Sequence, residues 1–397
     1  MRLAGPDGEA LRFRPPGRLE AAAWCATHTH PIRGSAPGWW ARRAGYDGPM
    51  DGPRRRTRTG DPDTQQSAAA ARSAEPFAAV DPAAFPDRET RRAIDGGAAS
   101  ARFRELLDAG GPVMADGAMG TMLFQNGLQF GDPPEVWNLT QPEIIRRIQR
   151  GYLDAGSQII MTNTFGGNRL RLALHGLSAR VDELNRTAAI LARAEVRAAG
   201  DHALVAGDIG PSGEIVAPLG TLDYDIAVDV FREQATSLVA GGVDLIWIET
   251  MSDLNEIKAA IEGVRLAAPG IALITTMTFD TRGHTMMGVT PEQAVEALVA
   301  WGADAVGGNC GNGPDELLPV IARMRAADPD AVLVAKSNAG MPELVDMRAV
   351  YKADSDTMAD FAIRFRDAGA TIVGACCGST PDHLRAMSAA LRPARGG

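Results

Sequence analysis

The chain has 397 residues, of which 45% are hydrophobic, and its formal net charge is −9. This length allows one large domain or two ordinary ones, and the apolar content is sufficient for a sizeable core. The acidic balance gives no reason to expect a nucleic-acid partner. Because the sequence has no run of about 18 apolar residues, we expect no membrane span either.

The first part of the chain differs in composition from the rest. Residues 1–100 contain 15 Arg against 12 Asp and Glu, whereas the remainder contains 25 basic and 37 acidic residues. Residues 1–95 also hold 11 of the 25 prolines and show poor hydrophobic periodicity. Such a segment cannot bury enough apolar surface to offset the loss of chain entropy. We therefore expect residues 1–95 to form a disordered leader, and we assign it no function.

From about residue 100, short apolar runs alternate with longer amphipathic segments. Runs that are apolar throughout are typical of strands buried on both faces of a parallel sheet. Eight such runs occur, at 112–116, 158–163, 204–207, 245–249, 273–279, 305–310, 332–337 and 371–376.

The segments between these runs have the period of a helix. Ile145, Ile148 and Tyr152 recur at steps of three and four and so share one face. Thr290-Pro291 places a capping residue before a proline at the first helical position. Several segments end in Ala-Gly or Gly-Gly, which is typical of helix C-termini.

Eight strand–helix units in about 290 residues predict a protein of the α/β class, a single-domain (β/α)8 barrel over residues 100–392. A doubly wound open sheet is the alternative fold. It is disfavoured because no Gly-x-Gly-x-x-Gly sequence follows any of the predicted strands.

Four cysteines occur, at positions 25, 310, 376 and 377, which is too few for a disulfide scaffold in a chain of this length. The N-terminus has no apolar region typical of a secretory signal, so we expect a reducing, cytoplasmic location. In that compartment, grouped cysteines bind metal more often than they form disulfides.

Three of the cysteines follow predicted strands. Cys310 ends the sixth run, and Cys376 and Cys377 end the eighth. Active sites of such barrels lie at the carboxyl ends of the strands, so the three thiols can converge there. Three thiolates with an open fourth position describe a catalytic zinc site, in which zinc would deprotonate a bound thiol. A redox-active vicinal pair is the alternative, but it would not explain Cys310.

Six motifs together resemble the homocysteine S-methyltransferase family, and the resemblance covers roughly residues 105–392. The two that contain cysteine are Gly307-Gly308-Asn309-Cys310-Gly311 and Gly374-Ala375-Cys376-Cys377-Gly378-Ser379-Thr380. The other four lie at the carboxyl ends of the first four predicted strands, beginning at Asp116, Thr162, Asp208 and Ile248.

The resemblance implies a zinc enzyme with a (β/α)8 fold, in which Cys310, Cys376 and Cys377 match the metal ligands. Asp116 and Glu249 match carboxylates that hold the amino group of homocysteine, as an ammonium in a partly buried pocket requires. Without the family, Asp116 would be interpreted as a turn residue and Glu249 as an acid near a helix start.

The resemblance also suggests further binding residues. Asn163 is a candidate hydrogen-bonding group around the site. The segments 135–139 and 164–169 most resemble bacterial betaine–homocysteine methyltransferases. Betaine is a quaternary ammonium that binds aromatic faces, and Trp137 and Phe165 are the candidates for such a cage. Gly166 stands where animal enzymes of this kind have tyrosine, so the donor pocket must be built differently.

The sequence therefore predicts zinc-dependent transfer of a methyl group from betaine to the thiolate of homocysteine, forming methionine. Three alternatives stay open. The donor could be a sulfonium such as S-methylmethionine, the barrel could receive its methyl group from a separate corrinoid protein, or it could bind zinc and thiols without catalysis. The sequence does not indicate an oligomeric state.

Overall fold

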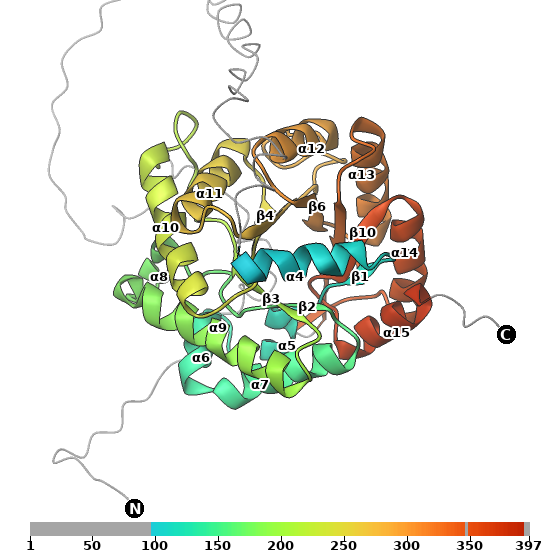
Figure 1. The fold of residues 1–397 in the computed structure, drawn as a ribbon, viewed down its shortest axis with the longest axis horizontal. Helices are drawn as coiled ribbons and strands as arrows, with labels where there is room; N and C mark the ends of the chain where they lie inside the picture. Colours follow the sequence, from blue (N-terminus) through green and yellow to red (C-terminus); the bar gives the residue numbers. More distant parts are fainter. Residues whose placement is uncertain (1–96, 346–347, 393–397) are drawn as a thin grey trace, which may run out of the picture.

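The computed structural model describes residues 97–345 and 348–392 (Figure 1). The predicted leader, residues 1–95, lies outside the described residues. Eight parallel strands form one sheet in the order β1-β10-β7-β6-β5-β4-β3-β2. A parallel bridge between Ala115 and Ile159 joins the first strand to the last, so the sheet closes on itself. The (β/α)8 barrel is confirmed, and the open sheet is excluded.

The strands lie where the eight apolar runs predicted them, and nearly all of their residues are buried because side chains pack on both faces. Their bounds are β1 Val113–Met114, β2 Ile159–Met161, β3 Leu204–Ile209, β4 Leu245–Met251, β5 Ala272–Met277, β6 Ala305–Cys310, β7 Leu333–Ser337 and β10 Ala370–Ala375.

Helices surround the barrel. They are α4 Gly97–Asp108, α5 Met119–Gln125, α6 Trp137–Thr140, α7 Pro142–Asp154, α8 Arg169–Ala173, α9 Val181–Ala198, α10 Tyr224–Ala240, α11 Leu254–Ala267, α12 Pro291–Ala300, α13 Pro314–Ala327, α14 Ser355–Asp367 and α15 Pro381–Leu391, with 3-10 turns η2 Pro134–Val136 and η3 Ser178–Arg180. As predicted, α7 buries Ile145, Ile148 and Tyr152. Thr290 caps α12 in a reciprocal pair with Gln293.

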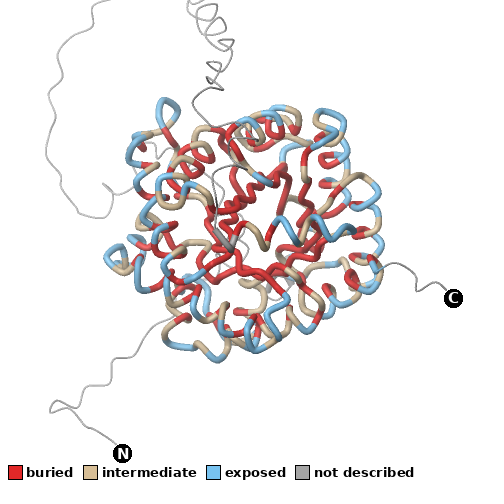
Figure 2. Tube along the Cα trace, in the orientation of Figure 1, coloured by how far each residue is buried: buried red, intermediate tan, exposed pale blue. Residues whose placement is uncertain are grey.

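The buried residues of Figure 2 follow the strands, and they form two main clusters. The larger cluster lies between the strands and the surrounding helices. The smaller one takes alternate strand residues, such as Val113, Ile159 and Trp247, and also includes Phe103 of α4. Alternation along a barrel strand assigns this second cluster to the interior of the barrel.

Helix α4 crosses one end of the barrel in Figure 1. Its Phe103 is only 1% exposed, and Leu106 and Leu107 pack against the interior cluster beside it. Arg102 is ion-paired with Asp244, at 3.0 Å, just before β4. Because Asp244 precedes its strand, α4 covers the amino-terminal end of the barrel and leaves the carboxyl end for the site. The sequence interpretation did not identify this helix.

A short antiparallel hairpin, β8 Glu343–Val345 and β9 Arg348–Val350, lies between β7 and α14 and was also not predicted. The chain that follows it reaches the loop after β10. The Ala353 N–H donates to the Ala339 carbonyl, and a ring nitrogen of His383 lies 3.1 Å from the Ala353 carbonyl oxygen. Tyr351, directly after β9, lies against Gly378, so the chain that follows the hairpin contacts the loop that carries Cys376 and Cys377.

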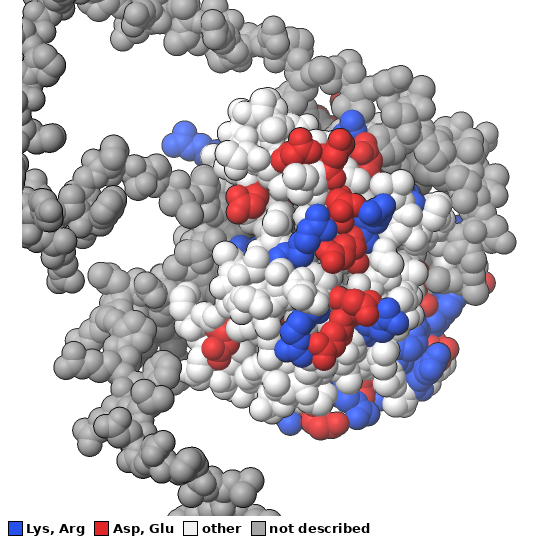
Figure 3. All heavy atoms as spheres, turned by 90° about the vertical axis from the view of Figure 1, so that its left-hand side faces the viewer, with Lys and Arg blue, Asp and Glu red and all other residues white. Residues whose placement is uncertain are grey.

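Acidic and basic side chains alternate over the face shown in Figure 3. Ion pairs on the outer helices include Arg169 with Glu233 and Arg186 with Asp182. Such a mixed surface lacks the single-sign potential that would attract a polyelectrolyte. No helix within residues 97–345 and 348–392 is long and apolar enough to cross a membrane.

Candidate metal centre and substrate site

The three cysteines predicted to bind metal come together at the carboxyl end of the barrel. Cys310 is the last residue of β6, and Cys376 and Cys377 directly follow β10. The three sulfur atoms lie within 4.8 Å of one another, and the Sγ atoms of Cys310 and Cys376 are 2.8 Å apart. Within the described part of the chain, this is the one grouping of His, Cys, Asp and Glu side chains that could hold a metal ion.

The backbone holds these cysteines in defined positions. Cys310 has a φ of 58°, a left-handed conformation that non-glycine residues seldom adopt, and Gly311 continues it at 70°. The Cys376 N–H donates to the Ser337 carbonyl at 2.7 Å, and the Ser379 hydroxyl donates to the Cys376 carbonyl at 2.8 Å. Strained backbone that is fixed by its surroundings is typical of functional sites.

The three thiols could hold a metal ion such as zinc. Zinc holds thiolates at about 2.3 Å in a tetrahedron, which places any two sulfurs roughly 4 Å apart, so the Sγ atoms of Cys310 and Cys376, 2.8 Å apart, would have to separate to bind it. Hydrogen bonds from Cys310 and Cys377, together with the charge of Lys336, lower the pKa of the Cys376 thiol. The same contact with Cys376 raises the pKa of Cys310, so negative charge gathers on Cys376. A redox pair formed by Cys376 and Cys377 alone would leave the position of Cys310 unexplained.

Two predicted substrate carboxylates lie near the thiols, and both are close to a lysine that the sequence interpretation missed. Lys336 of β7 is 3% exposed, and its Nζ lies 3.3 Å from Oδ1 of Asp116 and 3.6 Å from Oε2 of Glu249. The Met161 N–H donates to the other oxygen of Asp116 at 2.8 Å. Burial raises the pKa of Glu249 to about 7, although the charge of Lys336 opposes the shift.

A third carboxylate, Asp208 near the end of β3, is also buried there, at 6% exposure. Burial, and then the charge of Glu249, raise its pKa well above the usual range. Its Oδ1 has no hydrogen-bond partner among the described residues. The sequence interpretation used Asp208 only as part of a motif, because a single acid at the end of a strand carries no further signal.

Asn309 links the metal centre to the carboxylates. Thr250, which follows Glu249, has a φ of 62°, and its N–H donates to Oδ1 of Asn309 at 2.8 Å. The Asn309 amide donates to the Thr250 hydroxyl at 2.7 Å and lies 3.5 Å from Oε2 of Glu249. One side chain, next to the ligand candidate Cys310, thus fixes both the backbone after β4 and the direction of Glu249.

The other predicted binding residues lie on the loops after β1 and β2. The Asn163 amide donates to the Pro134 carbonyl at 2.8 Å, so this side chain braces the segment that leads to α6. Trp137 begins α6 and packs partly buried against the outer core. Phe165 is half-buried, and its ring lies against Gly210 after β3.

Gly166 has a structural reason to be glycine. Its N–H donates to Oε1 of the buried Glu135 at 2.7 Å, and a Cβ built on Gly166 would lie 2.9 Å from the same oxygen. Any larger residue must displace this carboxylate. The loop after β2 is therefore built around the Glu135 carboxylate.

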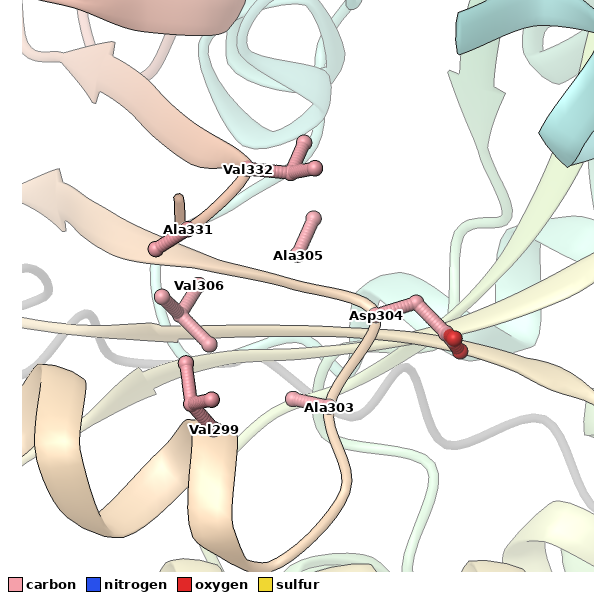
Figure 4. Close-up of a pocket in the computed structure, with 7 residues that line it drawn as sticks. All are labelled: Val299, Ala303, Asp304, Ala305, Val306, Ala331 and Val332. Carbon is pink, nitrogen blue, oxygen red and sulfur yellow. The ribbon is translucent and has the colours of Figure 1, made fainter. Parts of the chain in front are cut away.

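One small cavity is not part of this site. It has a volume of about 10 Å³, enough for a single water molecule, and is lined by seven residues from the starts of β6 and β7 and the end of α12 (Figure 4). Val306 and Val332 are among them. These residues lie toward the amino-terminal end of the barrel, opposite the thiols, so the cavity cannot serve a substrate.

The fold and sequence are similar to those of known proteins. A family model described as homocysteine S-methyltransferase matches residues 113–391. Two structures of the homocysteine methyltransferase MmuM from Escherichia coli, the oxidized and the metallated form, superpose with TM-scores of 0.62 and 0.61 at 25% identity. Each comparison covers 72% of this chain and 99% of the other.

Longer proteins are related as well. The methionine synthases of Mycobacterium leprae (strain TN) and Mycobacterium tuberculosis (strain ATCC 25618 / H37Rv) are each 32% identical over 295 residues. The matched region is 70% of this chain but 24% of each relative, so the chain spans about a quarter of their length.

Proposed function

The chain belongs to the homocysteine S-methyltransferase family, and on that premise we propose that it transfers a methyl group to the thiol of homocysteine. We further propose zinc as the resident metal and a small onium compound as the donor, with betaine as the first candidate. The observation that carries this proposal is the cluster of Cys310, Cys376 and Cys377 beside buried carboxylates.

The three cysteines would hold the zinc ion. Zinc bound by three thiolates keeps a fourth position and deprotonates a thiol that coordinates there. The donor set supports this choice of metal, since soft sulfur ligands select zinc over magnesium or calcium. The hydrogen bonds within the cluster and the nearby Lys336 stabilise the anionic form of Cys376 before any ligand arrives.

The carboxylates would bind and orient the substrates. Asp116, Asp208 and Glu249 are buried together with a single lysine, so acidic groups exceed basic groups in this pocket. Such a pocket favours the ammonium of an amino acid and the positive charge of an onium donor. Holding the donor methyl in line with the thiol sulfur would supply much of the rate acceleration.

The donor would bind above the thiols, between the loops after β1 and β2. Trp137 and Phe165 offer aromatic faces for a quaternary ammonium or a sulfonium. Asn163 would act through its bond to Pro134, by fixing the loop that carries Trp137. Because cation–π attraction does not separate betaine from S-methylmethionine, the donor has to be identified by assay.

One observation favours a second candidate function. The related mycobacterial methionine synthases are about four times as long as the region matched here. A barrel of this kind could bind homocysteine and take its methyl group from a separate corrinoid protein. That reading predicts homocysteine binding without turnover on any free small donor.

The first test is methionine formation by the full chain loaded with zinc, with homocysteine and either betaine or S-methylmethionine. We expect turnover with betaine. Turnover with S-methylmethionine alone would change the donor but keep the acceptor. Binding of homocysteine without turnover on either donor would replace the proposal with the corrinoid-partner function.

We predict that Cys376→Ala lowers the zinc content below half an equivalent and reduces methionine formation by at least 100-fold, because two thiols cannot hold the ion with comparable affinity. Metal analysis and the methionine assay are made on the same preparation. Cys25→Ala is the matched control and should keep both properties. Full zinc and full activity in Cys376→Ala would contradict the assignment of the metal centre.

A further inference from the structure

Lys336 occupies the place where a substrate ammonium would be expected. The resemblance to the family assigns Asp116 and Glu249 to the amino group of homocysteine, yet the Lys336 Nζ already lies 3.3 Å and 3.6 Å from these two carboxylates. This ammonium comes from the chain itself, on β7, and is almost completely buried. Two ammonium groups cannot share one such position, because like charges at contact distance repel strongly.

Several contacts keep the lysine in this position. Its Nζ lies 5.4 Å from the centre of the Trp247 ring and 2.7 Å from the sulfur of Met161. Both neighbours belong to the interior cluster of the barrel and are fully or almost fully buried. Moving Lys336 would leave Asp116 and Glu249 without their cation in a buried site, which is costly.

Of the three buried carboxylates in this pocket, Asp208 is the one that does not form an ion pair with Lys336. It is more than nine-tenths buried, its Oδ1 has no hydrogen-bond partner, and the charges nearest to it include Glu249, Lys336 and Asp116. Oδ1 of Asp116 also lacks a hydrogen bond, but Lys336 Nζ lies 3.3 Å from it, whereas no ion pair reaches Asp208 within the described residues. A buried carboxylate oxygen without a hydrogen-bond partner is unfavourable. It becomes favourable when a cationic ligand supplies the missing hydrogen bond, so the unpaired oxygen marks where such a ligand belongs.

We propose that Lys336 permanently fills the position between Asp116 and Glu249, and that Asp208 binds the ammonium of the amino-acid substrate in its place. The proposal rests on the proposed function for the identity of that substrate. It makes Lys336 a positioning residue, since it acts through the two carboxylates that it neutralises. It makes Asp208 a substrate-binding residue.

The first experiment measures binding rather than turnover. Isothermal titration of the full, zinc-loaded chain compares homocysteine with 4-mercaptobutanoate, which has the same thiol and carboxylate but no amino group. We expect Asp208→Asn to weaken homocysteine binding by about 10- to 100-fold, the value of a charged hydrogen bond, and to change 4-mercaptobutanoate binding less than threefold. Equal effects on both ligands, or on neither, would overturn the role of Asp208.

The control variant is Asp244→Asn, a buried carboxylate at the opposite end of β4 that is paired with Arg102. Its affinity for both ligands should match that of the wild type. A selective loss of homocysteine binding in this variant would mean that the Asp208 effect is general, and would count against the proposal.

The second experiment needs no substrate. Lys336→Ala removes the side chain beyond Cβ, and n-propylammonium has the atoms to replace it. We expect this amine to raise the melting temperature of Lys336→Ala in a saturable way, or to recover folded protein if the variant does not fold alone. The wild type and Lys336→Met, whose side chain still fills the space, should not respond. Absence of rescue would overturn the occupancy of the position by Lys336.

The two experiments separate the proposals. A wild-type chain that binds no homocysteine would contradict the proposed function and the role of Asp208, whereas amine rescue would still support the role of Lys336. Normal homocysteine binding without selectivity in Asp208→Asn would contradict only the inference.

Discussion

At the scale of single residues, the site depends on side chains that fix other side chains. Asn309 is the clearest case, because its amide holds Thr250 in a left-handed conformation and contacts Glu249. Since Asn309 precedes Cys310, a change in either the metal centre or the carboxylate pocket can be transmitted to the other. The metal centre and the carboxylate pocket are therefore coupled through Asn309.

We predict that Asn309→Ala lowers the free energy of unfolding by about 1–3 kcal/mol, since the buried Thr250 N–H and hydroxyl lose their partner. The KM for homocysteine should rise more than tenfold, because Glu249 and the Lys336 ammonium that it holds both lose their orientation beside the substrate. Chemical denaturation and steady-state kinetics provide the two measurements. Asn312→Ala, three positions along and bonded to the exposed Glu316, is the control. Equal behaviour of the two variants would argue against a positioning role.

At the scale of elements, the loops after the strands carry buried acids whose charges affect stability. Glu256 lies in the first turn of α11, and its Oε1 accepts hydrogen bonds from both the N–H and the hydroxyl of Ser212 after β3. Burial raises the pKa of Glu256 to about 7, from 4.5. The contact joins two neighbouring loops at the carboxyl end of the barrel.

The raised pKa of Glu256 determines how its contribution to the free energy of unfolding changes with pH. The folded state favours the protonated form, so the contribution of Glu256 is most favourable below pH 4.5 and is lost as the pH rises through 7. The full difference is on the order of 3 kcal/mol. We predict that the free energy of unfolding of Glu256→Gln, relative to that of the wild type, increases as the pH is raised from 5 to 8.

Urea denaturation of both proteins at pH 5 and pH 8 measures this change. The relevant quantity is the pH dependence of their difference, because any constant cost of the amide cancels. Glu105→Gln, an exposed carboxylate on α4, serves as the control and should show no such dependence. A difference between Glu256→Gln and the wild type that is constant from pH 5 to pH 8 would contradict the prediction.

At the scale of the whole molecule, the two ends of the barrel have separate tasks. Helix α4 covers the amino-terminal end, where Phe103 completes the interior cluster, while the thiols and carboxylates lie at the carboxyl end. Substitutions beneath α4 should therefore affect stability and leave the chemistry of the site unchanged.

We predict that Phe103→Ala destabilises the fold by about 3–5 kcal/mol, as expected for a large buried side chain, without changing the zinc content of the folded protein. Phe130→Ala, at a position 41% exposed, should cost less than about 1 kcal/mol. Denaturation curves and metal analysis below the unfolding transition test both values. A lower zinc content in folded Phe103→Ala would show that the two ends are coupled.

The sequence by itself determined the barrel and the metal candidates. Each of the eight strands is a short run that is apolar on both faces, and such a run can be recognised in the sequence without knowing which strands lie beside it. Cys310, Cys376 and Cys377 were identifiable because they end two of these runs, and parallel strands of a barrel end at the same rim. Helix α4 and the hairpin β8–β9 were not predicted from the sequence. The strands of the hairpin are very short, and α4 is recognisable only by the barrel end that it covers.

Only the tertiary structure decided how the acidic pocket is arranged. Lys336 lies within an apolar run, and Asp208 directly follows another, so neither position carries a local pattern that distinguishes a buried ion pair from an exposed charge. Their roles arise when closure of the sheet directs β1, β3, β4 and β7 toward one interior. The charge that neutralises Asp116 and Glu249 then comes from a residue more than 80 positions away from either. In a closed barrel, side chains from distant strands meet across the interior, so their spacing along the sequence does not indicate which of them are in contact.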